Sequence, residues 1–88
     1  MMNNELVALA KARSGKSQQE MANDMGHNGH TRLSKIAKGQ LEPDASEIVY
    51  LASAANMEPI EVLADIESIR HPELAMVWES LKKKMRNL

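Results

Sequence analysis

Apolar residues recur every three or four positions along most of this chain, and no segment alternates apolar and polar residues over the length of a strand. This spacing predicts α-helices, in which one face repeats about every 3.6 residues. The only aromatic residues are Tyr50 and Trp78, so residues that favour strands are scarce. We therefore predict an all-α fold.

Local signals divide the chain into six predicted helices. A cap at Asn3 or Asn4 and a stop at Gly15 bound the first. Ser17 and Glu20 have the spacing of a capping box, which predicts a second helix over about 17–25. Leu6, Leu9, Ala10 and Arg13 lie on one face of the first helix, and the second is expected to bury Met21, Ala22 and Met25.

The second half of the chain repeats these signals. Asp44 and Glu47 predict a capped helix that ends near residues 57–59. Pro59 and Pro72 each fit the first turn of a further helix. The inward side chains expected on the helices that begin at Asp44 and Pro59 are Ile48, Leu51, Ala52, Ala55, Leu63, Ile66 and Ile69.

The stretch between the second and fourth helices carries the most specific motif. "SQQEMANDMG" closely resembles the first half of the helix-turn-helix in the Cro and lambda-repressor-like family, and "TRLSKIAKGQLEP" supplies the apolar pair, glycine and proline of the second half. One residue is inserted in the turn, within 27–29. We predict a third helix over about 29–38, capped by Asn28 and stopped by Gly39.

The resemblance implies a compact five-helix lambda-repressor-like DNA-binding domain over residues 1–70, followed by a C-terminal amphipathic helix over 71–88. It also implies that the third helix enters the major groove of DNA and that Gln18 approaches a phosphate.

With Leu33, Ile36 and Ala37 turned inward, the opposite face of the third helix is rich in hydrogen-bond donors. Arg32 and Lys35 can donate to guanine, and Thr31 can contact a thymine methyl. Lys38, Gln40 and Lys11 are candidates for backbone contacts. The predicted DNA-binding residues are Gln18, Asn28, His30, Thr31, Arg32, Lys35, Lys38 and Gln40.

Charge is segregated along the chain although its net value is only −1. Residues 1–41 hold six basic and three acidic side chains, for a net charge of +3. Residues 42–70 hold one basic and seven acidic, for −6, and residues 71–88 hold four and two, for +2. Because the local field determines where a polyanion docks, the first block is the expected DNA side.

The last helix carries a long apolar stripe: Leu74, Val77, Trp78, Leu81, Met85 and Leu88. Such a stripe must be covered, by the same helix of a second copy, by the rest of the domain or by another protein. We predict dimerisation through this stripe, with Trp78 as its anchor.

The sequence therefore predicts a transcriptional repressor, of phage or prophage type, that binds a near-palindromic operator as a homodimer. An antitoxin-type regulator or a protein-interaction module is the alternative, and an antirepressor or a toxin is the kind of protein partner expected. We expect no enzymatic activity, since no nucleophile motif or catalytic carboxylate pair is found. His27 and His30 alone do not make a zinc site, so no metal or cofactor is expected. Without cysteine, signal peptide or membrane segment, the expected location is the bacterial cytosol or nucleoid.

Overall fold

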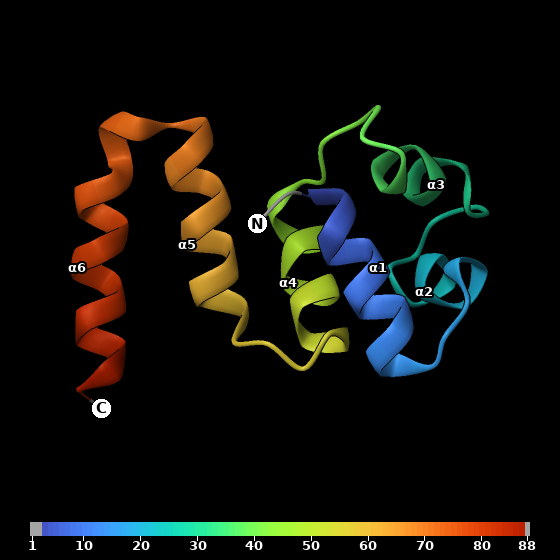
Figure 1. Ribbon diagram of the computed structural model, residues 1–88, viewed down its shortest axis with the longest axis horizontal. Coiled ribbons are helices and arrows are strands. Elements are labelled where there is room, and N and C mark those ends of the chain that lie inside the picture. The colour runs from blue at the N-terminus through green and yellow to red at the C-terminus, as the bar shows by residue number, and fades with distance from the viewer. Residues whose placement is uncertain (1–2, 88) are drawn as a thin grey trace.

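Helices follow one another along the whole described chain (Figure 1). The computed structural model describes residues 3–87, and within that range it contains no strand, which confirms the all-α prediction. The elements are α1 (Asn3–Ser14), α2 (Gln18–Asp24), α3 (Thr31–Ala37), α4 (Ala45–Ala54), α5 (Pro59–Arg70), the short 3₁₀ helix η1 (Pro72–Leu74) and α6 (Ala75–Arg86).

The predicted capping boxes form at the starts of α2 and α4. The Ser17 hydroxyl accepts from the Glu20 N–H at 3.1 Å, and the Glu20 carboxylate accepts from the Ser17 N–H at the same distance. Asp44 and Glu47 make the same reciprocal pair at 2.9 Å. These bonds satisfy N–H groups that the first turn of a helix leaves without partners, which fixes where both helices begin.

Two other predicted helix starts are wrong. Asn3 and Asn4 lie inside the first turn of α1 instead of before it. Asn28 does not cap α3, which begins two residues later than predicted, at Thr31. His30 occupies the capping position without a side-chain cap bond, because the inserted turn extends further than the sequence indicated.

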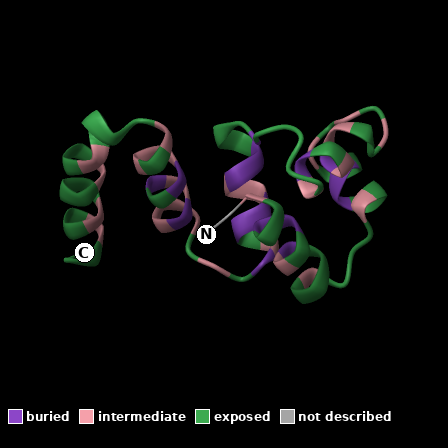
Figure 2. Cartoon of the chain, turned by 45° about the horizontal axis from the view of Figure 1, so that its top comes forward, coloured by how far each residue is buried: buried purple, intermediate pink, exposed green. Residues whose placement is uncertain are grey.

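The apolar core is built from the first five helices. Its buried members are Leu6, Val7, Ala10, Met21, Ala22, Leu33, Ile36, Ile48, Leu51, Ala52, Ala55, Val62 and Ile66. All the inward residues predicted for α4 belong to it. One prediction for α5 is wrong, since Ile69 is 69% exposed. No residue of α6 is buried (Figure 2).

The helices are arranged in a row along the 36 Å longest dimension of the molecule. α1 and α4 lie in the middle, with α2 and α3 at one end and the antiparallel pair α5 and α6 at the other (Figure 1). α1 packs against α3 and α4, α5 packs against α4, and α6 packs against α5. The pair α2 and α3 and the C-terminal helix α6 are therefore at opposite ends.

Polar contacts join α6 to α5. Lys82 Nζ lies 3.1 Å from an Asp65 carboxylate oxygen, and Arg86 NH2 lies 3.2 Å from Glu61 Oε1. Met85 also lies on the side of α6 that faces α5, where it lines a hollow together with Glu61 of α5. Trp78 precedes Lys82 and Met85 by four and seven residues, so it lies on this α5-facing side.

The predicted apolar stripe is consequently divided. Trp78 and Met85 are half-buried on the side of α5, whereas Leu74, Val77 and Leu81 stay exposed. Of the alternatives for covering the stripe, packing on its own domain accounts for the first pair and leaves the other three uncovered. Leu88 lies outside the described residues. Among the described helices, none has the length and apolar character needed to cross a membrane.

Candidate nucleic-acid interface

α2, α3 and the turn between them form the candidate site. Met21 and Ala22 of α2 and Leu33 and Ile36 of α3 are fully buried, so each helix turns one face to the core. Gly26 ends α2 with φ +80°, a left-handed conformation that favours glycine. Its N–H donates to the Asn23 carbonyl at 3.0 Å, as expected where glycine closes a helix.

The outward side of α3 and its flanking loops presents most of the predicted DNA-binding residues. His30, Thr31, Lys35 and Lys38 are exposed, and the loop residues Asn28 and Gln40 are exposed as well. Gln18, the first residue of α2, is half-buried. We name the exposed residues of α3 and its loops the outer surface of α3: Asn28, His30, Thr31, Lys35, Lys38 and Gln40.

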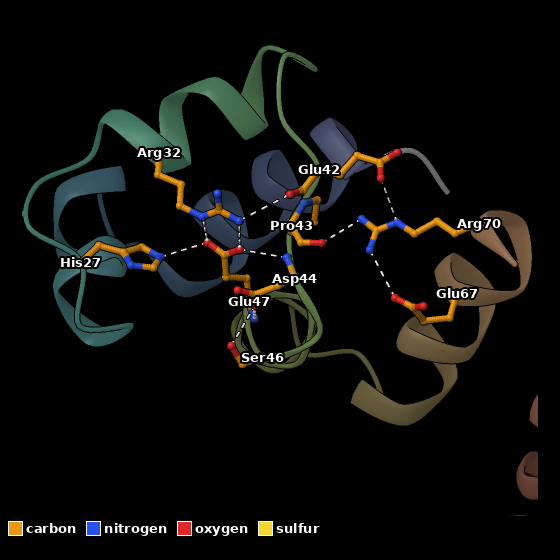
Figure 3. A network of polar contacts seen from close by, with 9 residues as sticks. All are labelled: His27, Arg32, Glu42, Pro43, Asp44, Ser46, Glu47, Glu67 and Arg70. Atoms are coloured by element: carbon orange, nitrogen blue, oxygen red, sulfur yellow. Dashed lines mark hydrogen bonds and ion pairs between the residues drawn. The ribbon is translucent and has the colours of Figure 1, made fainter.

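Arg32, which was predicted to donate to guanine, also makes an ion pair that the sequence did not predict. Its Nε lies 2.8 Å from Glu47 Oε2 and its NH2 lies 2.6 Å from Glu47 Oε1, a two-point ion pair with α4 (Figure 3). The Arg32 side chain is 39% exposed, but Glu47 is only 2% exposed. Because a buried carboxylate needs its partner, the guanidinium is committed to the fold.

Glu47 accepts two further hydrogen bonds. His27 Nε2 lies 2.9 Å from Oε2, and the Asp44 N–H donates to Oε1 at 2.9 Å. Burial alone raises the pKa of the Glu47 carboxyl, but the hydrogen bonds from Arg32, Asp44 and His27 outweigh it and lower the pKa to about 2. The ionised carboxylate therefore ties α3 and the preceding turn to α4.

The loop between α3 and α4 is also tied to α5. Arg70 NH2 donates to the Pro43 carbonyl at 2.8 Å, and its NH1 lies 3.2 Å from a Glu67 oxygen (Figure 3). Arg70 Nε, which is buried, lies 3.3 Å from Glu42 Oε2. The loop before α3 is thus held by Glu47, and the loop after α3 is held by Arg70.

α2 is held by Asp24. Its Oδ2 accepts hydrogen bonds from Lys16 Nζ and from the Tyr50 hydroxyl, each at 2.5 Å. The bonds from Lys16 and Tyr50 lower the pKa of Asp24. Burial, followed by the bond to Asp24, raises the pKa of Tyr50 to about 12. The hydroxyl of α4 is therefore a stable donor to α2 at neutral pH.

An open hollow lies beside the outer surface of α3, bordered by residues 26–29, Thr31, Arg32, Lys35 and Leu41. Leu41 was not predicted as a site residue, although it is 39% exposed. Leu41 lies in the loop between α3 and α4, so no helical periodicity of the sequence could mark it as exposed. The hollow combines two cationic side chains, a hydroxyl and an apolar side chain.

Other site chemistries find little support in the described residues. Between residues 3 and 87, no three His, Cys, Asp or Glu side chains gather closely enough to hold a metal ion. His27, half of the weak zinc motif, instead contacts Glu47. No protein-family model, curated protein or solved structure matches the chain.

Proposed function

We propose that this protein binds double-stranded DNA through the outer surface of α3 and acts as a transcriptional repressor. In this proposal the five N-terminal helices form a lambda-repressor-like domain, and α3 enters the major groove, which is wide enough for one helix. The observation that carries the proposal is the exposed donor row of α3 set above its fully buried apolar pair, Leu33 and Ile36.

The distribution of charge supports the same orientation. Residues 1–41 have a net charge of +3 and residues 42–70 a net charge of −6. The acidic block includes α4, in the middle of the row of helices, and α5, which lies beyond α4 from α3 (Figure 1). DNA, a polyanion, is therefore attracted to the block of residues 1–41 and repelled by the block of residues 42–70.

Each exposed side chain has a distinct proposed role. Lys35 donates to guanine, and Thr31 and His30 reach neighbouring base edges. Asn28, Lys38, Gln40 and Gln18 contact the sugar–phosphate backbone. Arg32 is a positioning residue, because its guanidinium holds α3 against Glu47.

Binding to a random duplex at several salt concentrations tests the proposal. Contacts between cations and phosphates release counterions, so the affinity should fall steeply as salt rises. Lys38→Ala should reduce the slope of log affinity against log salt by about 1. Lys83→Ala is the matched control, because this lysine is exposed on α6 at the opposite end. A flat salt response, or equal effects of the two variants, would contradict the proposal.

Selection of bound duplexes from a random pool tests sequence specificity. We propose a near-palindromic operator read by a homodimer, with the two copies of α3 one or more whole duplex turns of about 34 Å apart. Lys35→Ala should relax the preference at one base pair in each half-site, with a loss of about 1–3 kcal/mol of discrimination. Sites without two-fold symmetry would refute the homodimer. As a DNA-binding repressor, the protein would work in the bacterial cytosol or nucleoid.

A second candidate function is a protein-interaction module or antitoxin-type regulator. The exposed apolar side chains of α6 favour it, since a cluster of uncovered apolar side chains marks contact with another protein. An antirepressor or toxin is the kind of partner that this function implies. Salt-independent DNA binding together with retained self-association would favour this candidate.

A further inference from the structure

One side of α6 remains apolar and uncovered after α6 has packed on α5. Val77 is 63% exposed, and Leu74, Met76 and Leu81 are exposed as well. A shallow groove runs along this side, lined by Met76, Val77, Ser80, Leu81 and Lys84. We name these five residues together with Leu74 the outer face of α6.

The ends of the outer face carry opposite charges. Glu73 lies at its beginning, in η1, and is exposed. Lys84 lies at its far end and is also exposed. Lys84 follows Val77 by seven residues within α6, so helical spacing puts these two on one side, and Glu73 lies next to Leu74 at the start of the outer face.

We propose that the outer face of α6 pairs with the same face of a second copy in antiparallel orientation. A two-fold axis at the level of residue 79 sets Val77 against Leu81 of the partner copy, and Leu74 against Lys84. This pairing rests on the proposed homodimer and adds its orientation and register.

Charge complementarity selects the antiparallel arrangement. It brings the acidic beginning of each outer face to the cationic end of the other, so Glu73 lies near the second copy's Lys84. A parallel pair would set Lys84 against Lys84 and Glu73 against Glu73, and like charges across a pair are destabilising. The helix dipoles are also opposed in the antiparallel arrangement, which is favourable.

The size of the outer face predicts a weak dimer. α6 has 12 residues, which corresponds to a length of about 18 Å. A pair of such helices belongs to the low end of protein interfaces, below about 1,200 Å² in total. The free protein should therefore dissociate at moderate concentration, and an operator with two half-sites should bring the copies together.

Single-cysteine variants test orientation and register, because the chain contains no cysteine. Ser80→Cys lies beside the proposed axis and should form a disulfide-linked dimer on oxidation. Lys84→Cys alone should not, since its two copies would be about 15 Å apart along the axis, beyond disulfide reach. Leu74→Cys mixed with Lys84→Cys should form the mixed dimer. Lys11→Cys, exposed on α1, is the control for random collision.

The outcomes are distinct. Self-linked Lys84→Cys at the rate of Ser80→Cys indicates a parallel pair and overturns the proposal. Linkage of every variant at the rate of Lys11→Cys indicates no pairing, which overturns it too. These measurements contain no DNA, so their failure is separate from failure of the salt-dependence test.

Charge exchange gives a second test by sedimentation. Glu73→Lys and Lys84→Glu should each weaken self-association, by about twofold to tenfold for two symmetric exposed pairs. Combining both changes in one chain should restore it, because the opposite charges then meet again. Additive weakening in the combined variant would overturn the antiparallel register.

Discussion

Replacing Glu47 with glutamine tests the connection between α3 and α4. The change removes the charge that Arg32 and His27 contact and keeps a side chain of nearly the same shape. Glutamine can still accept from the Asp44 N–H, as in a capping box. The Arg32 side chain is 39% exposed, so water can solvate the guanidinium that loses its partner. The variant thus removes the charge together with the oxygen that contacts Arg32 Nε and His27 Nε2, and keeps the cap.

The pKa of Glu47 sets the magnitude. Folding lowers it from 4.5 to about 2, and each unit corresponds to about 1.4 kcal/mol. The ionised carboxylate therefore contributes about 3 kcal/mol to the free energy of unfolding at pH 7. Because the folded pKa is the lower one, this stability is complete above pH 4.5 and is lost as the pH falls towards 2.

Urea denaturation at pH 7 and pH 3 measures both effects. At pH 7 Glu47→Gln should unfold with about 3 kcal/mol less free energy, equivalent to about 12–24 °C in melting temperature for a domain of this size. At pH 3 the gap between variant and native protein should shrink by about 2 kcal/mol, because part of the native carboxylate stability has been lost. Glu79→Gln, exposed on α6, is the control and should change stability by less than about 0.5 kcal/mol.

A stability gap that is the same at pH 7 and pH 3 would refute the reasoning, since the loss would then come from packing and not from charge. Equal effects of Glu47→Gln and Glu79→Gln would refute it as well, because the buried carboxylate would then have no special role.

Three further predictions concern the ion pair of α3, the packing of α6 and the backbone at Gly26. Arg32→Met and Glu47→Gln should together destabilise by less than the sum of their separate effects, and a double-mutant cycle in urea measures that coupling; strict additivity would count against the ion pair. Trp78→Ala should speed hydrogen exchange of the α6 amides while the core amides keep their protection, because α6 adds no side chain to the core. Val77→Ala, on the outer face, should leave α6 protection unchanged in dilute protein, and equal effects of the two would contradict the division of the stripe. Gly26→Ala should cost about 1–2 kcal/mol through its φ of +80° alone, since no atom lies within 4 Å of the added carbon; a loss above about 3 kcal/mol in urea would indicate a steric clash.

Local signals determined how well the sequence predicted the fold. Ser17 with Glu20 and Asp44 with Glu47 are pairs three residues apart, and their bonds form within one helical turn. Ile69 was misplaced because steps of three residues drift by about 60° each around a helix. Over Leu63, Ile66 and Ile69 that drift carries the last side chain away from the core. Counting apolar residues at steps of three does not register this accumulated rotation around the helix.

The candidate site was harder to predict because its main contact joins residues far apart. Arg32 and Glu47 are separated by 15 positions, and their spacing has no local meaning. One signal was available. Glu47 precedes Leu51 by four residues, so it lies on the inward face of α4, and an inward carboxylate requires a cationic partner. Glu47 was predicted only as part of a capping box.

The shortness of α3 limits how much information one copy can extract from DNA under the proposed function. Its seven residues extend about 10 Å, which corresponds to about three base pairs. Any sequence of three base pairs recurs many times among the roughly 10⁶–10⁹ competing sites of a genome. Recognition of a single locus would then depend on the spacing between two short half-sites, so the distance between the two copies of α3 would contribute to sequence specificity.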